Sequence, residues 1–216
     1  SLGYQLIKAK LQVIGSKDDV GTAKNFKSNI MQGTAEERMV ARYGIGLVAL
    51  KSQRYSEAES IFQDLAKQYS GQPHFATALA RTALESKNYR LALARYHKLT
   101  DQFPNNETIK LEYITTLVRS GEPGKAKQYL STLSYKTQKL PVYYELLAQV
   151  YNDLKQPIES HRYLAEFYYA RGQIQDAIFQ IRLARQSKGL TPQLLAILRE
   201  RHDFFLNEQL EAKRSQ

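Results

Sequence analysis

Apolar side chains recur every third or fourth residue along most of this chain. The stretch 55–69 shows the pattern clearly, because one face carries Tyr55, Ala58, Ile61, Phe62 and Leu65. This spacing follows the period of the α-helix and predicts amphipathic helices. Clusters of glycine, proline, serine and asparagine interrupt the pattern at regular intervals. No sustained alternation of period two predicts a strand. We therefore expect an all-α protein of about twelve helices.

The predicted helices begin at recognisable signals. Thr34 with Glu37, and Ser56 with Glu59, have the spacing of a capping box, in which two amides at the helix start are satisfied reciprocally. Four prolines suit the first helical turn, where their missing N–H costs no hydrogen bond. They are Pro73, Pro141, Pro157 and Pro192.

Small residues recur at a longer and nearly constant spacing. They are Ala23, Ala58, Ala92, Ala126 and Ser160. A small residue lets the backbones of two crossing helices approach closely, and each interval is long enough for two helices with their turns. The chain therefore resembles a tetratricopeptide-repeat array, whose period of about 34 residues matches this spacing. The resemblance implies an all-α tetratricopeptide-repeat solenoid.

The repeat changes phase near the end of the chain. Ala177 follows Ser160 by only half of the repeat period, so we expect helix 157–171 to serve two successive repeats. A final helix over about 192–213 is expected to cover the last apolar face. Its apolar stripe carries Leu194, Leu198, His202 and Phe205. Because no shift in composition divides the chain, we expect a single domain over residues 1–216.

Composition narrows the possible chemistry. The chain has no cysteine, which excludes disulfides, thiolate metal sites and cysteine nucleophiles. The formal net charge of +10 suggests a nucleic-acid-binding protein, but the basic residues are spread out rather than gathered in a run. We therefore expect no nucleic-acid groove. No apolar run approaches the ~18 residues of a transmembrane helix, so we expect no membrane insertion. The residues given contain no signal peptide.

Sequence motifs of catalysis are missing. The four histidines, His74, His97, His161 and His202, lie far apart, and none belongs to an H-E-x-x-H motif. Gly44 and Gly46 interrupt a helical pattern and are better explained by helix packing than by a phosphate loop. We therefore expect no catalytic residue, no metal ligand and no cofactor-binding residue in this chain.

Two surfaces are candidates for binding a partner. Aromatic residues crowd the stretch 143–169, where they form either a buried core or a tyrosine-rich binding surface, and both interpretations stay open. The other candidate is the concave face made by the first helix of each repeat, the usual binding face of solenoids. There the guanidinium groups of Arg81 and Arg119 are suited to holding a carboxylate. The repeat register places on it Tyr43, Leu47, His74, Arg81, Glu112, Thr115, Arg119, Gln149 and Asn152.

Four stretches of the chain resemble one particular family of repeat-containing proteins. Residues 4–13 (YQLIKAKLQV), 42–50 (RYGIGLVAL), 164–172 (LAEFYYARG) and 177–184 (AIFQIRLA) resemble segments of the C-terminal repeat domain of periplasmic zinc metallopeptidases of the β-barrel-assembly-enhancing type. The final helix departs from that family's pattern.

This resemblance implies a non-catalytic domain of a bacterial envelope enzyme. Its catalytic domain and zinc ligands would lie upstream of these residues. The implied partners are proteins, namely its own protease domain, components of the outer-membrane barrel-assembly machinery and misassembled outer-membrane proteins. The alternatives are a free-standing tetratricopeptide-repeat scaffold and, third, a basic solenoid that binds nucleic acid.

Overall fold

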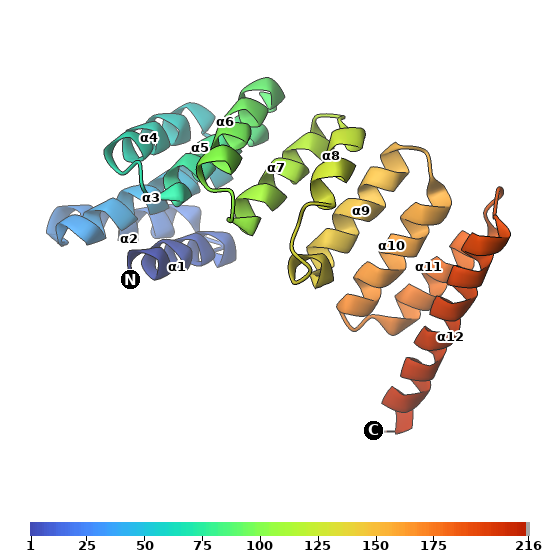
Figure 1. The fold of residues 1–216 in the computed structure, drawn as a ribbon. Helices are drawn as coiled ribbons and strands as arrows, with labels where there is room; N and C mark the ends of the chain where they lie inside the picture. Colours follow the sequence, from blue (N-terminus) through green and yellow to red (C-terminus); the bar gives the residue numbers. More distant parts are fainter. Residues whose placement is uncertain (215–216) are drawn as a thin grey trace. The chain divides into compact units, whose positions relative to one another are not determined.

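The computed structural model describes residues 1–214, and within them every regular element is helical (Figure 1). Twelve α-helices and one short 3-10 helix follow one another. They are α1 (Leu2–Gly15), α2 (Asp19–Gln32), α3 (Ala35–Lys51), α4 (Tyr55–Gln68), α5 (Pro73–Glu85), α6 (Tyr89–Gln102), α7 (Glu107–Arg119), α8 (Pro123–Leu130), η1 (Thr137–Lys139), α9 (Pro141–Asp153), α10 (Pro157–Ala170), α11 (Ile174–Gln186) and α12 (Pro192–Arg214). The expected fold class and helix number are confirmed.

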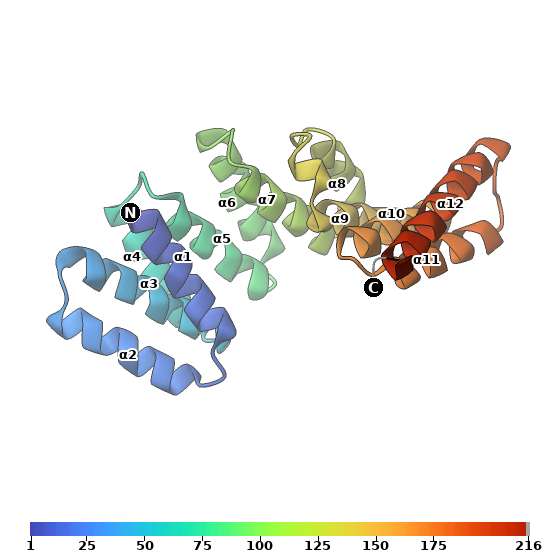
Figure 2. The same ribbon diagram turned by 90° about the horizontal axis from the view of Figure 1, so that it is seen from below.

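Contacts between helices divide the chain into two compact units. The first, unit 1, is Ser1–Ile109, and the second, unit 2, is Lys110–Gln216. In unit 1, α3 packs against α1, α2 and α4, and α5 packs against α4 and α6. Figures 1 and 2 show α1 lying alongside α3. In unit 2, helices α8 to α11 each pack against the next helix along the chain. The expectation of a single domain stays a prediction.

The turns between paired helices share one backbone conformation, which recurs with the repeat period of the sequence. Gln53, Lys87, Gly121 and Lys155 all have positive φ, and each stands one repeat period after the one before it. Each ends its helix in a Schellman motif, in which the next amide donates to a carbonyl five residues back. Examples are the bonds from Arg54 N to Ala49 O, 2.8 Å, and from Asn88 N to Ala83 O, 2.8 Å.

The phase change near the end of the chain is also visible in these turns. Gly172, with φ of +75°, forms the same turn only half a repeat period after Lys155. As expected, α10 packs against both α9 and α11 and so serves two repeats. The last helix, α12, buries Leu198 and Phe205 in a core shared with α11, with Leu194 packed beside them.

The small residues lie where helices cross. Ala58, Ala92 and Ala126 are fully buried, and the Ser160 hydroxyl donates to the Ala148 carbonyl of α9 at 2.9 Å. Helix α2 differs by one residue, because Thr22 rather than Ala23 is its buried small residue. The Thr22 hydroxyl stays satisfied by donating to the Asp18 carbonyl at 2.7 Å.

Most predicted helix starts are confirmed. Helices α5, α9, α10 and α12 begin at the four predicted prolines. Thr34 and Glu37 form the predicted capping box. The Ser56 capping box was wrong, because α4 already begins at Tyr55. Glu59 instead accepts two hydrogen bonds from the Arg95 guanidinium of α6, at 2.5 and 3.3 Å.

No helix within residues 1–214 combines the length and the apolar character that a membrane crossing needs.

Candidate protein-binding site

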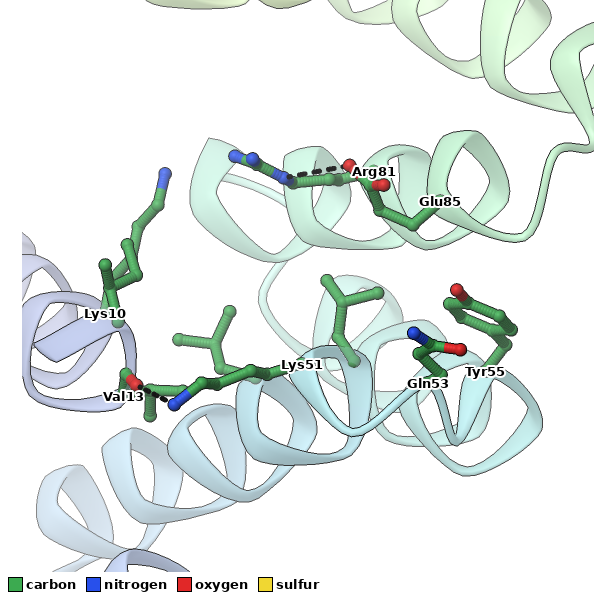
Figure 3. A pocket seen from close by; sticks show the side chains of 10 residues that line it. Lys10, Val13, Lys51, Gln53, Tyr55, Arg81 and Glu85 are labelled. Carbon is green, nitrogen blue, oxygen red and sulfur yellow. Dashed lines mark hydrogen bonds and ion pairs between the residues drawn. The ribbon is translucent and has the colours of Figure 1, made fainter. Parts of the chain in front are cut away.

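A pocket opens in unit 1 where α1, α3 and α5 face one another (Figure 3). These are the first helices of successive pairs, so the pocket lies on the face that solenoids use for binding. Its volume is about 370 Å³, which is within the range of ligand-binding clefts. It is lined by Lys10, Val13, Ile14, Leu47, Leu50, Lys51, Gln53, Tyr55, Arg81 and Glu85.

The floor of the pocket is apolar. Val13 of α1 and Leu47 of α3 are both buried, and Leu50 lies beside them. Val13, Leu47 and Arg81 stand one repeat period apart, so equivalent positions of three repeats meet in one pocket. The pocket is therefore formed by side chains that occupy the same position in three successive repeats.

Lys51 holds the α1 side of the pocket in place. Its amine donates to the backbone carbonyls of Val13 at 3.1 Å and Ser16 at 2.6 Å, and pairs with the Asp19 carboxylate at 2.7 Å. A cation at the C-terminal end of a helix satisfies its last carbonyls and complements the helix dipole. The hydrogen bond from Lys51 also lowers the pKa of the Asp19 carboxyl.

The rim of the pocket carries more positive than negative charge. Arg81 pairs with Glu85 on the same helix at 3.8 Å. In Figure 3 the Arg81 guanidinium extends from α5 toward the side of the opening where the Lys10 amine lies. Lys51 is the third cation of the lining, whereas Glu85 is its single carboxylate.

The structure brings two of the predicted residues of unit 1 into this pocket. Leu47 and Arg81 both line it. Tyr43 is instead buried, with its ring 5.5 Å from that of Phe75 and 5.8 Å from that of Phe62, which leaves little of it for a partner to touch. His74 is half-buried, and burial, followed by the charge of Lys10, lowers its pKa.

The other predicted residues belong to unit 2. Glu112, Thr115 and Arg119 lie on α7, and Gln149 and Asn152 lie on α9. Arg119, Gln149 and Asn152 are exposed. The Thr115 hydroxyl donates to the Leu111 carbonyl of its own helix at 2.8 Å. A binding role for these five residues stays a prediction.

Sequence reasoning missed the contribution of α1. Lys10, Val13 and Ile14 come from this helix, and Val13 stands one repeat period before Leu47. Extending the register by one period toward the N-terminus would have placed Val13 on the binding face. A second signal was the apolar character of α1 on two opposite sides.

The aromatic cluster of unit 2 is largely self-packed. Tyr151 and Tyr163 stack with ring centroids 5.3 Å apart, and Tyr169 packs on Phe205 at 5.1 Å. Burial raises the pKa of the Tyr163 and Tyr143 hydroxyls. These contacts give many of the rings a packing role, and the aromatic residues within 143–169 remain partly exposed.

The histidines do not form a metal site in the described part of the chain. Within residues 1–214, no three histidine or carboxylate side chains gather as metal ligands. Nδ1 of His161 lies 2.8 Å from Oε1 of Gln180, and His97 is exposed beside Asp101. Gly44 and Gly46 face the aromatic rings of Phe26 and Phe62, so their role is helix packing, as predicted.

Comparison with known families gives the class of this protein. Residues 40–71 and 83–150 each match a model of the tetratricopeptide repeat. The chain therefore carries tetratricopeptide repeats, a class of repeat that mediates protein–protein interaction.

Individual relatives narrow the comparison. The chain is 22% identical over 143 residues to the beta-barrel assembly-enhancing protease of Yersinia pestis. This match covers 65% of the chain and only 29% of that protease. Among solved structures, a tetratricopeptide repeat protein from Parabacteroides merdae is similar, with 11% identity and a TM-score of 0.49, over 95% of this chain and 99% of the other.

Proposed function

We propose that this chain binds proteins through the pocket face of unit 1. The observation that carries the proposal is a pocket formed by equivalent positions of three repeats, with an apolar floor and an ionic rim. An apolar centre surrounded by polar groups is the usual anatomy of a protein interface. The tetratricopeptide repeats support the same class of function.

The finer proposal concerns the parent protein. The chain is the repeat domain of a bacterial envelope metallopeptidase of the β-barrel-assembly-enhancing type, and works in the periplasm. The Yersinia relative supports this proposal, as do the resembling segments, which fall in α1, α3, α10 and α11. Its partners are its own protease domain, components of the barrel-assembly machinery and misassembled outer-membrane proteins.

In this proposal the repeat domain contributes binding rather than catalysis. Zinc and the hydrolytic residues belong to a separate catalytic domain of the parent protein. The alternative is a free-standing scaffold, and the shared repeat architecture is the observation in its favour. The two proposals make different predictions about which proteins touch the pocket.

Photo-crosslinking in the native bacterium tests both proposals. A photoreactive amino acid replaces Arg81 at the pocket, in the complete gene product, and a matched control replaces the exposed Lys67 of α4. We expect adducts with envelope proteins from position 81 and few from position 67. A free-standing scaffold would give adducts with proteins outside the envelope. Equal adducts from both positions would contradict binding through the pocket face.

The complete coding region provides an independent check. A signal peptide and an H-E-x-x-H motif upstream of Ser1 would support the metallopeptidase proposal. A reading frame without them would favour the scaffold.

A further inference from the structure

The first helix of unit 1 carries a row of exposed apolar side chains along its outer side. The row, here called the α1 stripe, consists of Tyr4, Ile7, Leu11 and Ile14, which are between 51% and 67% exposed. The side of α1 opposite to the stripe is buried in the core of unit 1. Elsewhere in residues 1–214 the large exposed apolar residues are scattered, with at most two on any one helix. A contiguous exposed apolar surface of this kind marks an interaction site.

The spacing of the α1 stripe is that of a coiled-coil seam. Its successive members are three, four and three residues apart, which is the a/d pattern of two heptads. Because each residue turns the helix by ~100°, the four side chains fall within an arc of ~80°. A helix that packs on a broad apolar surface presents a face wider than ~100°. The narrow stripe therefore fits a single partner helix better than a membrane surface.

Lysines border the α1 stripe on both sides. Lys8 lies beside one edge of the stripe and Lys10 beside the other, at the e and g positions of the same heptads. The segment Leu2–Gly15 contains no acidic residue. Opposite charges at the e and g positions stabilise a pair of helices. A partner helix with carboxylates beside its own apolar seam would therefore complement both edges of the stripe.

The same lysines argue against a second copy of this chain as the occupant. In an antiparallel pair of α1 helices, Lys8 and Lys10 would each lie opposite their own equivalents, so like charges would meet. In a parallel pair the two lysines would lie opposite Gly3 and Gly15, which offer no charge. Neither arrangement neutralises the lysines, whereas an acidic partner helix does.

We propose that the α1 stripe binds an amphipathic helix of a partner protein, with large aliphatic residues along one seam and aspartate or glutamate at the edges of that seam. About three turns of the partner helix cover the stripe, since it rises ~15 Å along α1. The stripe adjoins the pocket, because Ile14 and Lys10 also line it, but Tyr4, Ile7 and Leu11 lie outside the lining. The inference therefore assigns a second binding surface, beyond the proposed function of the pocket.

Selection from a library of displayed helices tests the inference. Each peptide is about three heptads long, with leucine or isoleucine at every a and d position. The e and g positions are randomised among glutamate, glutamine and lysine, and the peptides are selected on the full chain. The consensus peptide is then synthesised, and its affinity for the unchanged chain and for variants is measured by fluorescence anisotropy. Circular dichroism checks that every variant keeps its helical content.

We expect glutamate to dominate the e and g positions of the consensus. The double variant Ile7→Ser with Leu11→Ser removes apolar contacts from the middle of the stripe and should weaken binding about tenfold or more. The matched control is Met31→Ser, which removes an exposed apolar side chain from α2 of the same unit. This control should bind like the unchanged chain.

Charge reversal tests the edges of the stripe. The double variant Lys8→Glu with Lys10→Glu should prefer the same peptide with lysine in place of glutamate at the e and g positions, because opposite charges then meet again. Lys17→Glu with Lys24→Glu makes the same change of net charge at exposed positions outside the stripe. That control should keep the preference for the glutamate peptide.

Several results would overturn the inference. They are a consensus without a preference for glutamate, enrichment of no peptide, and equal binding by the double serine variant and Met31→Ser. A dimer that sedimentation detects in the unchanged chain and not in the double serine variant would assign the stripe to a second copy. Binding to phosphatidylcholine–phosphatidylglycerol vesicles that the same variant loses would assign it to a lipid surface. Adducts from position 81 in the crosslinking experiment report on the pocket alone, so the failures of the two proposals are distinguishable.

Discussion

At the scale of single residues, the glycines of α3 are fixed by the aromatic rings they face. A Cβ atom added at Gly46 would lie 2.5 Å from Cε1 of Phe62, a ring with no exposed surface. Because the ring cannot move into solvent, overpacking by the added Cβ atom of Gly46→Ala should cost ~1–3 kcal/mol, and we expect a net decrease in the free energy of unfolding of up to ~2 kcal/mol. The overpacking cost opposes the ~1 kcal/mol that alanine gains over glycine in a helix. Chemical denaturation measures the sum.

Gly124 is the matched control for this substitution. It lies in α8, and a Cβ atom added there would have no neighbour within 4 Å. Gly124→Ala should therefore leave stability unchanged or raise it. A Gly46→Ala variant as stable as the unchanged chain would show that the crossing of α3 and α4 is looser than the structure indicates.

His74 should make stability fall below neutral pH. Its Nδ1 atom is buried without a hydrogen-bond partner, and burial, together with the charge of Lys10, lowers its pKa. In the unfolded chain the same side chain titrates near the usual value of about 6.5. As the pH falls below that value, the unfolded state therefore binds a proton before the folded state does, and stability decreases toward the lowered pKa.

Thermal melts measure this effect. We expect the difference in Tm between about pH 7.5 and about pH 5.5 to shrink in His74→Gln, because the substituted side chain does not titrate. His97→Gln, at an exposed position, is the control and should keep most of the difference. An unchanged difference in His74→Gln would mean that other groups set the acid response.

At the scale of elements, the turns between paired helices use residues that do not suit their backbone. Lys87 has φ of +63°, a conformation that costs a residue with a Cβ atom ~1–2 kcal/mol. Gly121 occupies the equivalent turn of the next repeat. We expect Lys87→Gly to stabilise the protein by about 0.5 kcal/mol, since glycine also loses more entropy on folding. Urea denaturation checks the sign and size.

Lys98→Gly is the control for this change. Lys98 is exposed within α6, where glycine should cost ~1 kcal/mol through helix propensity alone. Opposite signs at positions 87 and 98 would establish that the turn conformation, rather than loss of a lysine, determines the effect. Destabilisation by both glycine substitutions would contradict the idea that the positive φ at position 87 costs stability.

The helices of this protein are well specified by its sequence because their signals are local. The period of three and four residues and the prolines at helix starts depend only on neighbouring residues, and the structure confirms them. The Ser56 capping box was wrong because α4 begins earlier than the pattern requires, with Arg54 at its N-cap, and Glu59 pairs with Arg95 of α6 instead. The pairing of Glu59 joins two helices, so a local sequence pattern carries no information about it.

The candidate site was only partly predictable. Leu47 and Arg81 follow from the repeat register, and both line the pocket. Tyr43 has the correct register, but its ring turns into the core beside Phe75. The contributions of Lys10 and Ile14 depend on how α1 packs against α3, which no local pattern specifies. The repeat register therefore predicted which helix face lines the pocket, but it did not predict which residues of α1 complete the lining.

At the scale of the whole molecule, the two units pose a question about cooperativity. Uniform composition predicts one domain over residues 1–216, whereas the contacts gather into two compact units. In repeat proteins each repeat is stabilised mainly by its nearest neighbours, so a local defect need not spread along the chain. The two possibilities differ in how far a defect in unit 1 destabilises unit 2.

Ala92→Leu provides that defect. Ala92 is fully buried in unit 1, and a larger side chain there should overpack the core by ~1–3 kcal/mol. Hydrogen exchange measured by mass spectrometry then reports the opening of each helix separately. We expect faster exchange in α5 and α6 and unchanged exchange in α10 and α11, because the stability of each repeat depends mainly on its neighbours. Equal acceleration in all four helices would instead show that residues 1–216 unfold as one cooperative domain, and unchanged exchange in α5 and α6 would contradict the close crossing at Ala92.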